Sequence, residues 1–108
     1  MPWKTAEHKR LAIKEVERAG LAGEVGMGSI TRSPDCPRIG WGHCTLYWVG
    51  VSLGVDLWDT TSTVDSMEAI SKATGLRNGA LVNIAEINDR HGWKRAVKAL
   101  NNLKVEGE

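Results

Sequence analysis

Apolar residues recur at helical spacing near the start of the chain. In AEHKRLAIKEVERAG, which follows Thr5, one face carries Leu11, Ala12, Val16 and Ala19, and charged residues occupy the positions between them. Thr5 can accept a hydrogen bond from the first turn, and glycine commonly ends a helix. The pattern therefore predicts a helix over residues 5–20 that ends at Gly20.

The helical periodicity stops in residues 21–42. This segment, LAGEVGMGSITRSPDCPRIGWG, holds five glycines and two prolines, which favour turns over regular elements. We expect a glycine- and proline-rich loop or a short hairpin. A connection of this length inside a small domain is more often functional than idle.

Helical patterns return in residues 43–104. HCTLYWVGVSLG suits a strand by its β-branched and aromatic content, but its near-continuous apolar character also suits a buried helix, and we predict a helix from His43 to about Leu53. Caps at residues 59–63 precede a second apolar stripe of Val64, Met67, Ile70 and Ala73, which ends at Gly75.

Two more helices are predicted towards the end of the chain. Asn78 is expected to cap the first, which DRHG at residues 89–92 would end. A final amphipathic stripe follows: Trp93, Ala96, Val97, Leu100 and Leu103. Together, the patterns predict a mostly α fold, with four or five short helices in a single domain over residues 1–108.

Composition and charge fit this prediction. The 108 residues are 42% hydrophobic and 25% charged, with a formal net charge of +1, as in ordinary globular domains. Such a small net charge disfavours attraction of nucleic acid over the whole surface. No apolar stretch approaches the roughly 18 residues of a membrane span, so we expect a cytoplasmic protein with no membrane partner.

One segment suggests cysteine chemistry. A cysteine at a helix N-terminus has a lowered pKa, and Cys44 would lie there, with His43 or His91 as its base. GHCTLYW at residues 42–48 is similar to the nucleophile segment of the cysteine- and histidine-dependent amidohydrolase/peptidase domains of phage lysins, but this chain lacks the strands of such domains. We favour a buried structural thiol, because free cysteine is among the most buried residue types.

Four residues could bind a metal ion: Cys36, His43, Cys44 and His91. Cys36, His43 and Cys44 follow a C-x6-H-C spacing, which matches no common zinc pattern, and the adjacent His43 and Cys44 cannot easily reach one ion. We therefore predict neither a metal nor a cofactor.

Tryptophans and cations supply candidates for contact with a partner. The chain has five tryptophans and no phenylalanine, and tryptophan serves cores and interfaces alike. We expect three to be core residues and one or two to lie on a contact surface. The candidate binding residues are Trp3, Arg38, Trp41, Arg90, Lys94 and Arg95. The cations Arg90, Lys94 and Arg95, together with Lys98, predict a solvated helix face first and a phosphate-contacting face second.

The order of motifs resembles a family of small uncharacterised proteins from actinobacteria and their phages. The shared features are a first helix, a loop with Ser-Pro-Asp at residues 33–35, then Trp41, Cys44 and an apolar helix, and finally Ile-Asn-Asp-x-x-Gly at residues 87–92. Ile87 stands where that family usually has tryptophan. The resemblance implies an all-helical fold and a bacterial or phage origin, and no activity.

These observations lead to one expectation and two alternatives. We expect a small non-catalytic interaction protein, such as a phage accessory or host-directed protein, that binds a protein partner in the host cytoplasm. The first alternative is a cysteine-dependent hydrolase that uses Cys44. The second is a nucleic-acid-binding helical module that uses the basic helix after Gly92.

Overall fold

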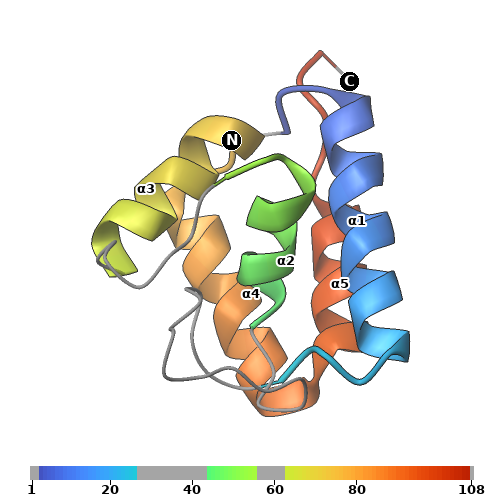
Figure 1. Ribbon diagram of the computed structural model, residues 1–108. Helices are drawn as coiled ribbons and strands as arrows, with labels where there is room; N and C mark the ends of the chain where they lie inside the picture. The colour runs from blue at the N-terminus through green and yellow to red at the C-terminus, as the bar shows by residue number, and fades with distance from the viewer. Residues whose placement is uncertain (1–2, 27–43, 56–62, 108) are drawn as a thin grey trace.

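The fold was obtained as a computed structural model, which describes residues 3–26, 44–55 and 63–107 (Figure 1). Its five helices are α1 (Ala6–Leu21), α2 (Thr45–Ser52), α3 (Thr63–Thr74), α4 (Asn78–His91) and α5 (Trp93–Asn102). Within the described ranges there is no strand, and an isolated bridge joins Trp3 near one end of the chain to Val105 near the other. The predicted mostly α class is confirmed. The greater part of the glycine-rich segment, with Cys36, Arg38, Trp41 and His43, lies outside the described residues.

Helix α1 begins where the sequence predicts. The Thr5 side chain accepts a hydrogen bond from the backbone N–H of His8 at 3.0 Å, and Ala12, Val16 and Ala19 are buried. The predicted end at Gly20 is wrong, because α1 runs on to Leu21 and the chain turns at Gly23 with φ of +74°. Gly20 has a packing role instead: a Cβ at this position would overlap the ring of Trp93.

Helix α2 is the central helix of the fold, in contact with α1, α3 and α4 (Figure 1). Most of its residues are buried, as its near-continuous apolar sequence predicts: Thr45, Leu46, Tyr47, Val49 and Gly50. Because Thr45–Ser52 is an α-helix, the prediction of a helix rather than a strand is confirmed. Cys44 forms the N-cap, and its sulfur accepts a hydrogen bond from the backbone N–H of Leu46 at 3.3 Å.

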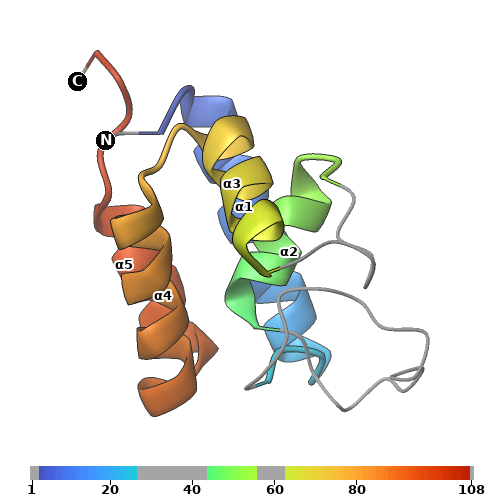
Figure 2. The ribbon, with the colours of Figure 1, turned by 90° about the vertical axis from the view of Figure 1, so that its left-hand side faces the viewer.

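Helices α4 and α5 form a tight hairpin and lie side by side (Figures 1 and 2). Two predicted boundaries are wrong here. Asn78 is the first helical residue and not the cap, a position that Arg77 takes without a side-chain hydrogen bond. The predicted break covers residues 89–92, but in the structure only Gly92 separates α4 from α5. Glycine adopts its φ of +91° without strain and so turns the chain in one residue.

The two ends of the described chain pair with each other. The backbone N–H of Trp3 donates to the carbonyl of Lys104 at 2.8 Å, and the N–H of Glu106 donates to the Trp3 carbonyl at 2.8 Å. The Lys4 N–H donates to the carbonyl of Thr74 at the end of α3, also at 2.8 Å. Trp3 and Lys4 are thus held between α3 and the segment that follows α5.

Trp3 belongs to the core, so its prediction as a contact residue is wrong. Its side chain is 0% exposed, and its indole N–H donates to the carbonyl of Leu100 at 3.2 Å. The pairing of the two chain ends directs the ring inward, where burial of a large aromatic surface stabilises the fold. Trp48 and Trp93 are half-buried at the edge of the same core.

Candidate functional site

Cys44 is buried, which confirms the sequence prediction. The residue is 2% exposed. Burial, which disfavours the charged thiolate, raises the pKa of Cys44 to about 11, and the nearby negative charge of Asp89 acts in the same direction. The backbone N–H of Leu46 opposes this shift, but burial dominates. At neutral pH the thiol is protonated and is therefore a poor nucleophile.

Among the described residues, no histidine forms a hydrogen bond with the Cys44 thiol and could act as its base. His91 is exposed at the end of α4, and no hydrogen bond joins it to the thiol. Its imidazole is thus in solvent, whereas the sulfur lies inside the fold. The other proposed base, His43, lies outside the described residues.

The described part of the chain has neither a metal-binding cluster nor a membrane-spanning helix. It contains no cluster of three or more histidine, cysteine, aspartate or glutamate side chains that could hold a metal ion. None of the helices there is long and apolar enough to cross a membrane.

We predict that Cys44 resists alkylation in the native protein. In a Cys36→Ser background, where Cys44 is the only thiol, iodoacetamide at pH 7.5 should react about a hundredfold more slowly than with the urea-unfolded chain, because the thiolate is scarce and enclosed. Intact mass against time gives both rates. Native and unfolded rates within a factor of three would show an accessible, ionisable thiol.

The raised pKa of Cys44 also predicts a pH dependence. The fold favours the neutral thiol, so its contribution to stability is complete below pH 9 and is lost as pH rises through about 11. The free energy of unfolding, from urea titrations at several pH values, should fall more steeply over this interval in the original protein than in Cys44→Ala. Identical slopes would contradict the assignment.

Asn88 forms a buried polar link that the sequence reading missed. This residue is 3% exposed. The Thr45 hydroxyl donates to its Oδ1 at 2.7 Å, and its Nδ2 donates to the carbonyl of Gly26 at 2.9 Å. Asn88 therefore ties α4 both to the start of α2 and to the segment after α1. The sequence showed an Ile-Asn-Asp motif there but not its buried partners.

Replacing Asn88 with alanine should destabilise the protein by about 1 to 2 kcal/mol, because the Thr45 hydroxyl and the Gly26 carbonyl both lose a partner inside the fold. Urea unfolding followed by circular dichroism measures the loss. Asn83→Ala is the matched control, since Asn83 is exposed on the same helix. Equal stability of the two variants would show that the link contributes nothing.

The predicted basic residues lie on the surface at the end of the α4–α5 hairpin. Arg90, Lys94 and Arg95 are all exposed. The Lys94 amine lies 5.8 Å from the centroid of the Trp93 ring, within the range of a cation–π contact. Helix α5 carries three cations and no acidic residue. It packs against both α1 and α4, so only one stripe of it faces solvent.

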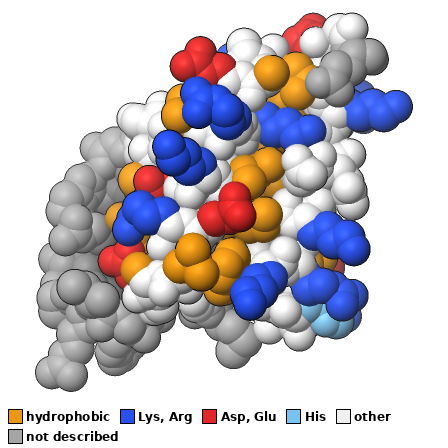
Figure 3. Space-filling model, turned by 90° about the vertical axis from the view of Figure 1, so that its right-hand side faces the viewer, with side chains coloured by type: hydrophobic (Ala, Val, Ile, Leu, Met, Phe, Trp, Pro, Cys, Tyr) orange, Lys and Arg blue, Asp and Glu red, His pale blue; other side chains and the backbone are white. Residues whose placement is uncertain are grey.

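Beside this stripe, α1 adds further cations. A shallow groove of about 320 Å³ runs along α1 where it meets α5. It is lined by Ala6, Lys9, Arg10, Ile13, Lys14, Glu17 and Asn101. Figure 3 shows Lys and Arg side chains on both sides of a band of hydrophobic side chains on this part of the surface. Their proximity comes from the α1–α5 packing, which no local sequence pattern reveals.

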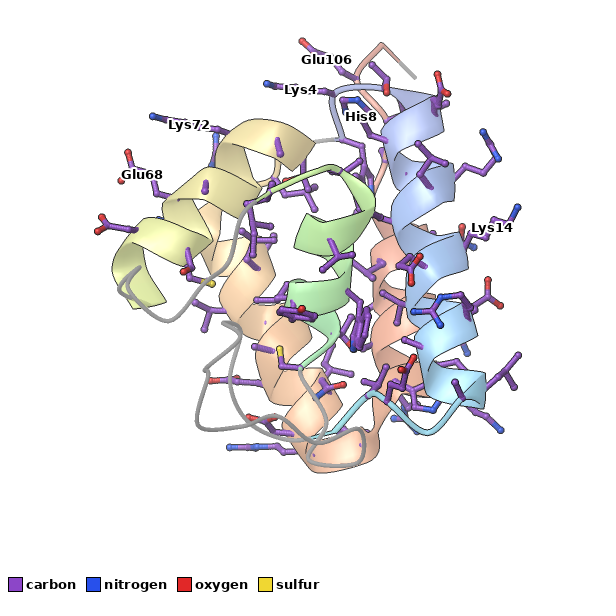
Figure 4. All side chains as sticks on the ribbon, viewed as in Figure 1. Lys4, His8, Lys14, Glu68, Lys72 and Glu106 are labelled. Atoms are coloured by element: carbon purple, nitrogen blue, oxygen red, sulfur yellow. The ribbon has the colours of Figure 1, made fainter. Side chains whose placement is uncertain are left out.

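The cations of α1 differ in how strongly each is held by a partner within the protein. The Lys9 amine donates to the carbonyl of Leu103 at 2.8 Å, where it neutralises the C-terminal end of α5. Arg18 pairs with Glu15 and Glu24. Arg10 lies 4.0 Å from Glu7, and both side chains are more than 60% exposed, so water screens that pair strongly. Lys14 points away from the fold (Figure 4). Arg10 and Lys14 are therefore available to a partner.

Comparison with known proteins gives no match: no family model, curated protein or solved structure matches the chain.

Proposed function

We propose that this protein is a small non-catalytic interaction protein that binds a protein partner through the exposed face of α1 and α5. The observation that carries the proposal is the groove between these two helices, with its apolar floor and cationic rim. Binding surfaces of this kind combine an apolar contact area with charged groups that fix orientation. The burial of Cys44 counts against the hydrolase alternative.

The contact surface proposed here differs from the tryptophan surface that the sequence favoured. Trp3 is enclosed, and Trp41 and Arg38 lie outside the described residues. Lys94 and Lys98, two of the three cations of α5, share one face with Asn101 by helical spacing, and Asn101 lines the groove. These residues and the α1 cations Arg10 and Lys14 form one continuous surface, called here the α1/α5 face.

The biological setting belongs to the same proposal. The resemblance to small helical proteins of actinobacteria and their phages supports an accessory or host-directed role in the cytoplasm of a bacterial host. A partner in that setting would be a host or phage protein. An actinobacterial lysate is therefore the starting material for the test.

The test compares three tagged proteins as baits in that lysate. Arg10→Glu/Lys14→Glu/Lys98→Glu reverses three charges of the α1/α5 face, and Lys72→Glu reverses an exposed charge on α3, on the other side of the molecule (Figure 4). We expect the original protein and Lys72→Glu to retain the same partner, and the triple variant to retain at least tenfold less. The four substituted positions and their ion-pair neighbours Glu7 and Glu68 are all exposed, so the variants should unfold at similar urea concentrations.

Two results would contradict the proposal. One is that no protein is retained above the level of a bead control. The other is that the triple variant, shown to be folded by circular dichroism, retains the partner as well as the original protein does.

A further inference from the structure

The groove on the α1/α5 face has a chemical character that narrows the class of partner. Its apolar lining residues are Ala6 and the half-buried Ile13, and its charged lining residues are Lys9, Arg10, Lys14 and Glu17, with Asn101 contributed by α5. From Ala6 to Glu17 the α1 side extends for about 16 Å at the rise of an α-helix. That length accommodates about three turns of a second helix lying along the groove.

From this combination we infer that the groove binds an acidic amphipathic helix of the partner protein. Its apolar side chains would cover Ala6 and Ile13, and its carboxylates would face Arg10, Lys14 and Lys98. Docking of an amphipathic helix into a groove is a recurrent mode of protein recognition. The inference rests on the proposed function and deepens it, because it names the chemistry of the bound segment.

Charge complementarity is the main support for an acidic occupant. Helix α5 carries Lys94, Arg95 and Lys98 with no carboxylate. On α1, Arg18 is engaged by its own glutamates and Lys9 by a backbone carbonyl, whereas Arg10 and Lys14 extend towards solvent at the groove. A basic helix would be repelled by this rim, and a neutral helix would leave its cations without partners.

A nucleic acid fits the same surface less well. Glu17 lines the groove, and a phosphate backbone is charged along its whole length, so along α1 it would lie against Glu17 as well as the cations. A helix can place its carboxylates opposite Arg10, Lys14 and Lys98 and its uncharged side chains opposite Glu17. Phosphates also gain nothing from an apolar floor. The net charge of +1 provides little long-range attraction to a polyanion.

The test uses a synthetic peptide of 14 residues as the probe. It carries leucines at positions i, i+3, i+4 and i+7 on one face and glutamates on the flanks, and its control peptide has glutamine at every glutamate. Each is titrated into the full-length 15N-labelled protein. We expect amide shifts concentrated in α1 and α5, at least tenfold weaker binding of the glutamine peptide, and affinity for the glutamate peptide that falls as salt is raised.

Variants of the protein make the test specific. Arg10→Glu/Lys14→Glu/Lys98→Glu should bind the glutamate peptide at least tenfold more weakly, and Lys72→Glu should bind it within twofold of the original affinity. Any of four results would overturn the inference: no shifts with the glutamate peptide, equal affinity for both peptides, shifts centred on α3, or tighter binding of a 20-base-pair DNA duplex at 150 mM salt.

A failure of this inference is distinguishable from a failure of the proposed function. If the lysate partner is retained through the α1/α5 face but deletion of its acidic segments does not weaken binding, the occupant is wrong and the function stands. If the triple variant retains the partner fully, the proposed function itself is wrong. Self-association of the chain through this face, seen as a dimer by sedimentation, would also overturn the choice of occupant.

Discussion

Replacing Trp3 with alanine should lower the free energy of unfolding by about 3 to 5 kcal/mol, the largest effect expected of any single substitution considered for this protein. The side chain is completely enclosed and donates a hydrogen bond to the Leu100 carbonyl, so its removal opens a large cavity and leaves that carbonyl with only the backbone N–H of Leu103 as donor. A domain of this size is stable by only about 5 to 15 kcal/mol in total. Urea unfolding followed by circular dichroism gives the value directly.

Two controls separate packing from other effects of the Trp3 substitution. Trp3→Phe keeps an aromatic ring and loses the indole N–H, so it should cost less than Trp3→Ala. Lys4→Ala alters the exposed neighbouring side chain and should stay within about 0.5 kcal/mol of the original protein. A loss below about 1 kcal/mol for Trp3→Ala would show that the first residues are not part of the folded core.

The second large effect is expected at Gly20, where α1 packs against the Trp93 ring of α5. Gly20→Ala should destabilise the protein by about 2 to 3 kcal/mol, although alanine is the better helix former, because its Cβ would overlap the Trp93 ring. Gly79→Ala is the matched control in α4. No atom lies within 4 Å of the Cβ there, so this change should stabilise by about 0.5 to 1 kcal/mol.

A double variant isolates the contact at Gly20. In a Trp93→Ala background the ring is absent, so Gly20→Ala should cost little or nothing, and the difference between the two backgrounds measures the coupling. The same destabilisation in both backgrounds would show that the glycine acts through backbone conformation and not through contact with Trp93. All these stabilities come from urea titrations of the purified variants.

Hydrophobic periodicity predicted the helices of this protein well, because the buried residues of an amphipathic helix recur every three or four positions in the sequence. Thr5, Ala12, Val16 and Ala19 have the roles in α1 that their spacing indicated. Helix ends were less accurate. Gly20 looked like a stop signal, but its lack of a side chain serves a contact with Trp93, 73 positions later in the sequence. Local patterns contain no information about such a distant neighbour.

The candidate site was predicted only in part, because contacts between residues far apart in the sequence leave no local pattern. Lys94 and Arg95 were recognised as basic residues of the last helix, and their exposure agrees with the helical pattern. Arg10 and Lys14 have the spacing of an ordinary solvated face, and only the packing of α1 against α5 brings them to a groove beside Asn101. Trp3 was misassigned because its burial depends on backbone pairing with Lys104 and Glu106.

We propose that the α1/α5 face contacts a protein partner. Lysine footprinting of the complex recovered from the lysate measures this contact directly. The free protein and the complex are acetylated under identical limiting conditions, and the modification of each lysine is read by mass spectrometry. We expect Lys14 and Lys98 to become at least fivefold less reactive in the complex, while Lys72 on α3 reacts at its original rate. Protection of Lys72 with unchanged reactivity of Lys14 and Lys98 would contradict the proposed contact.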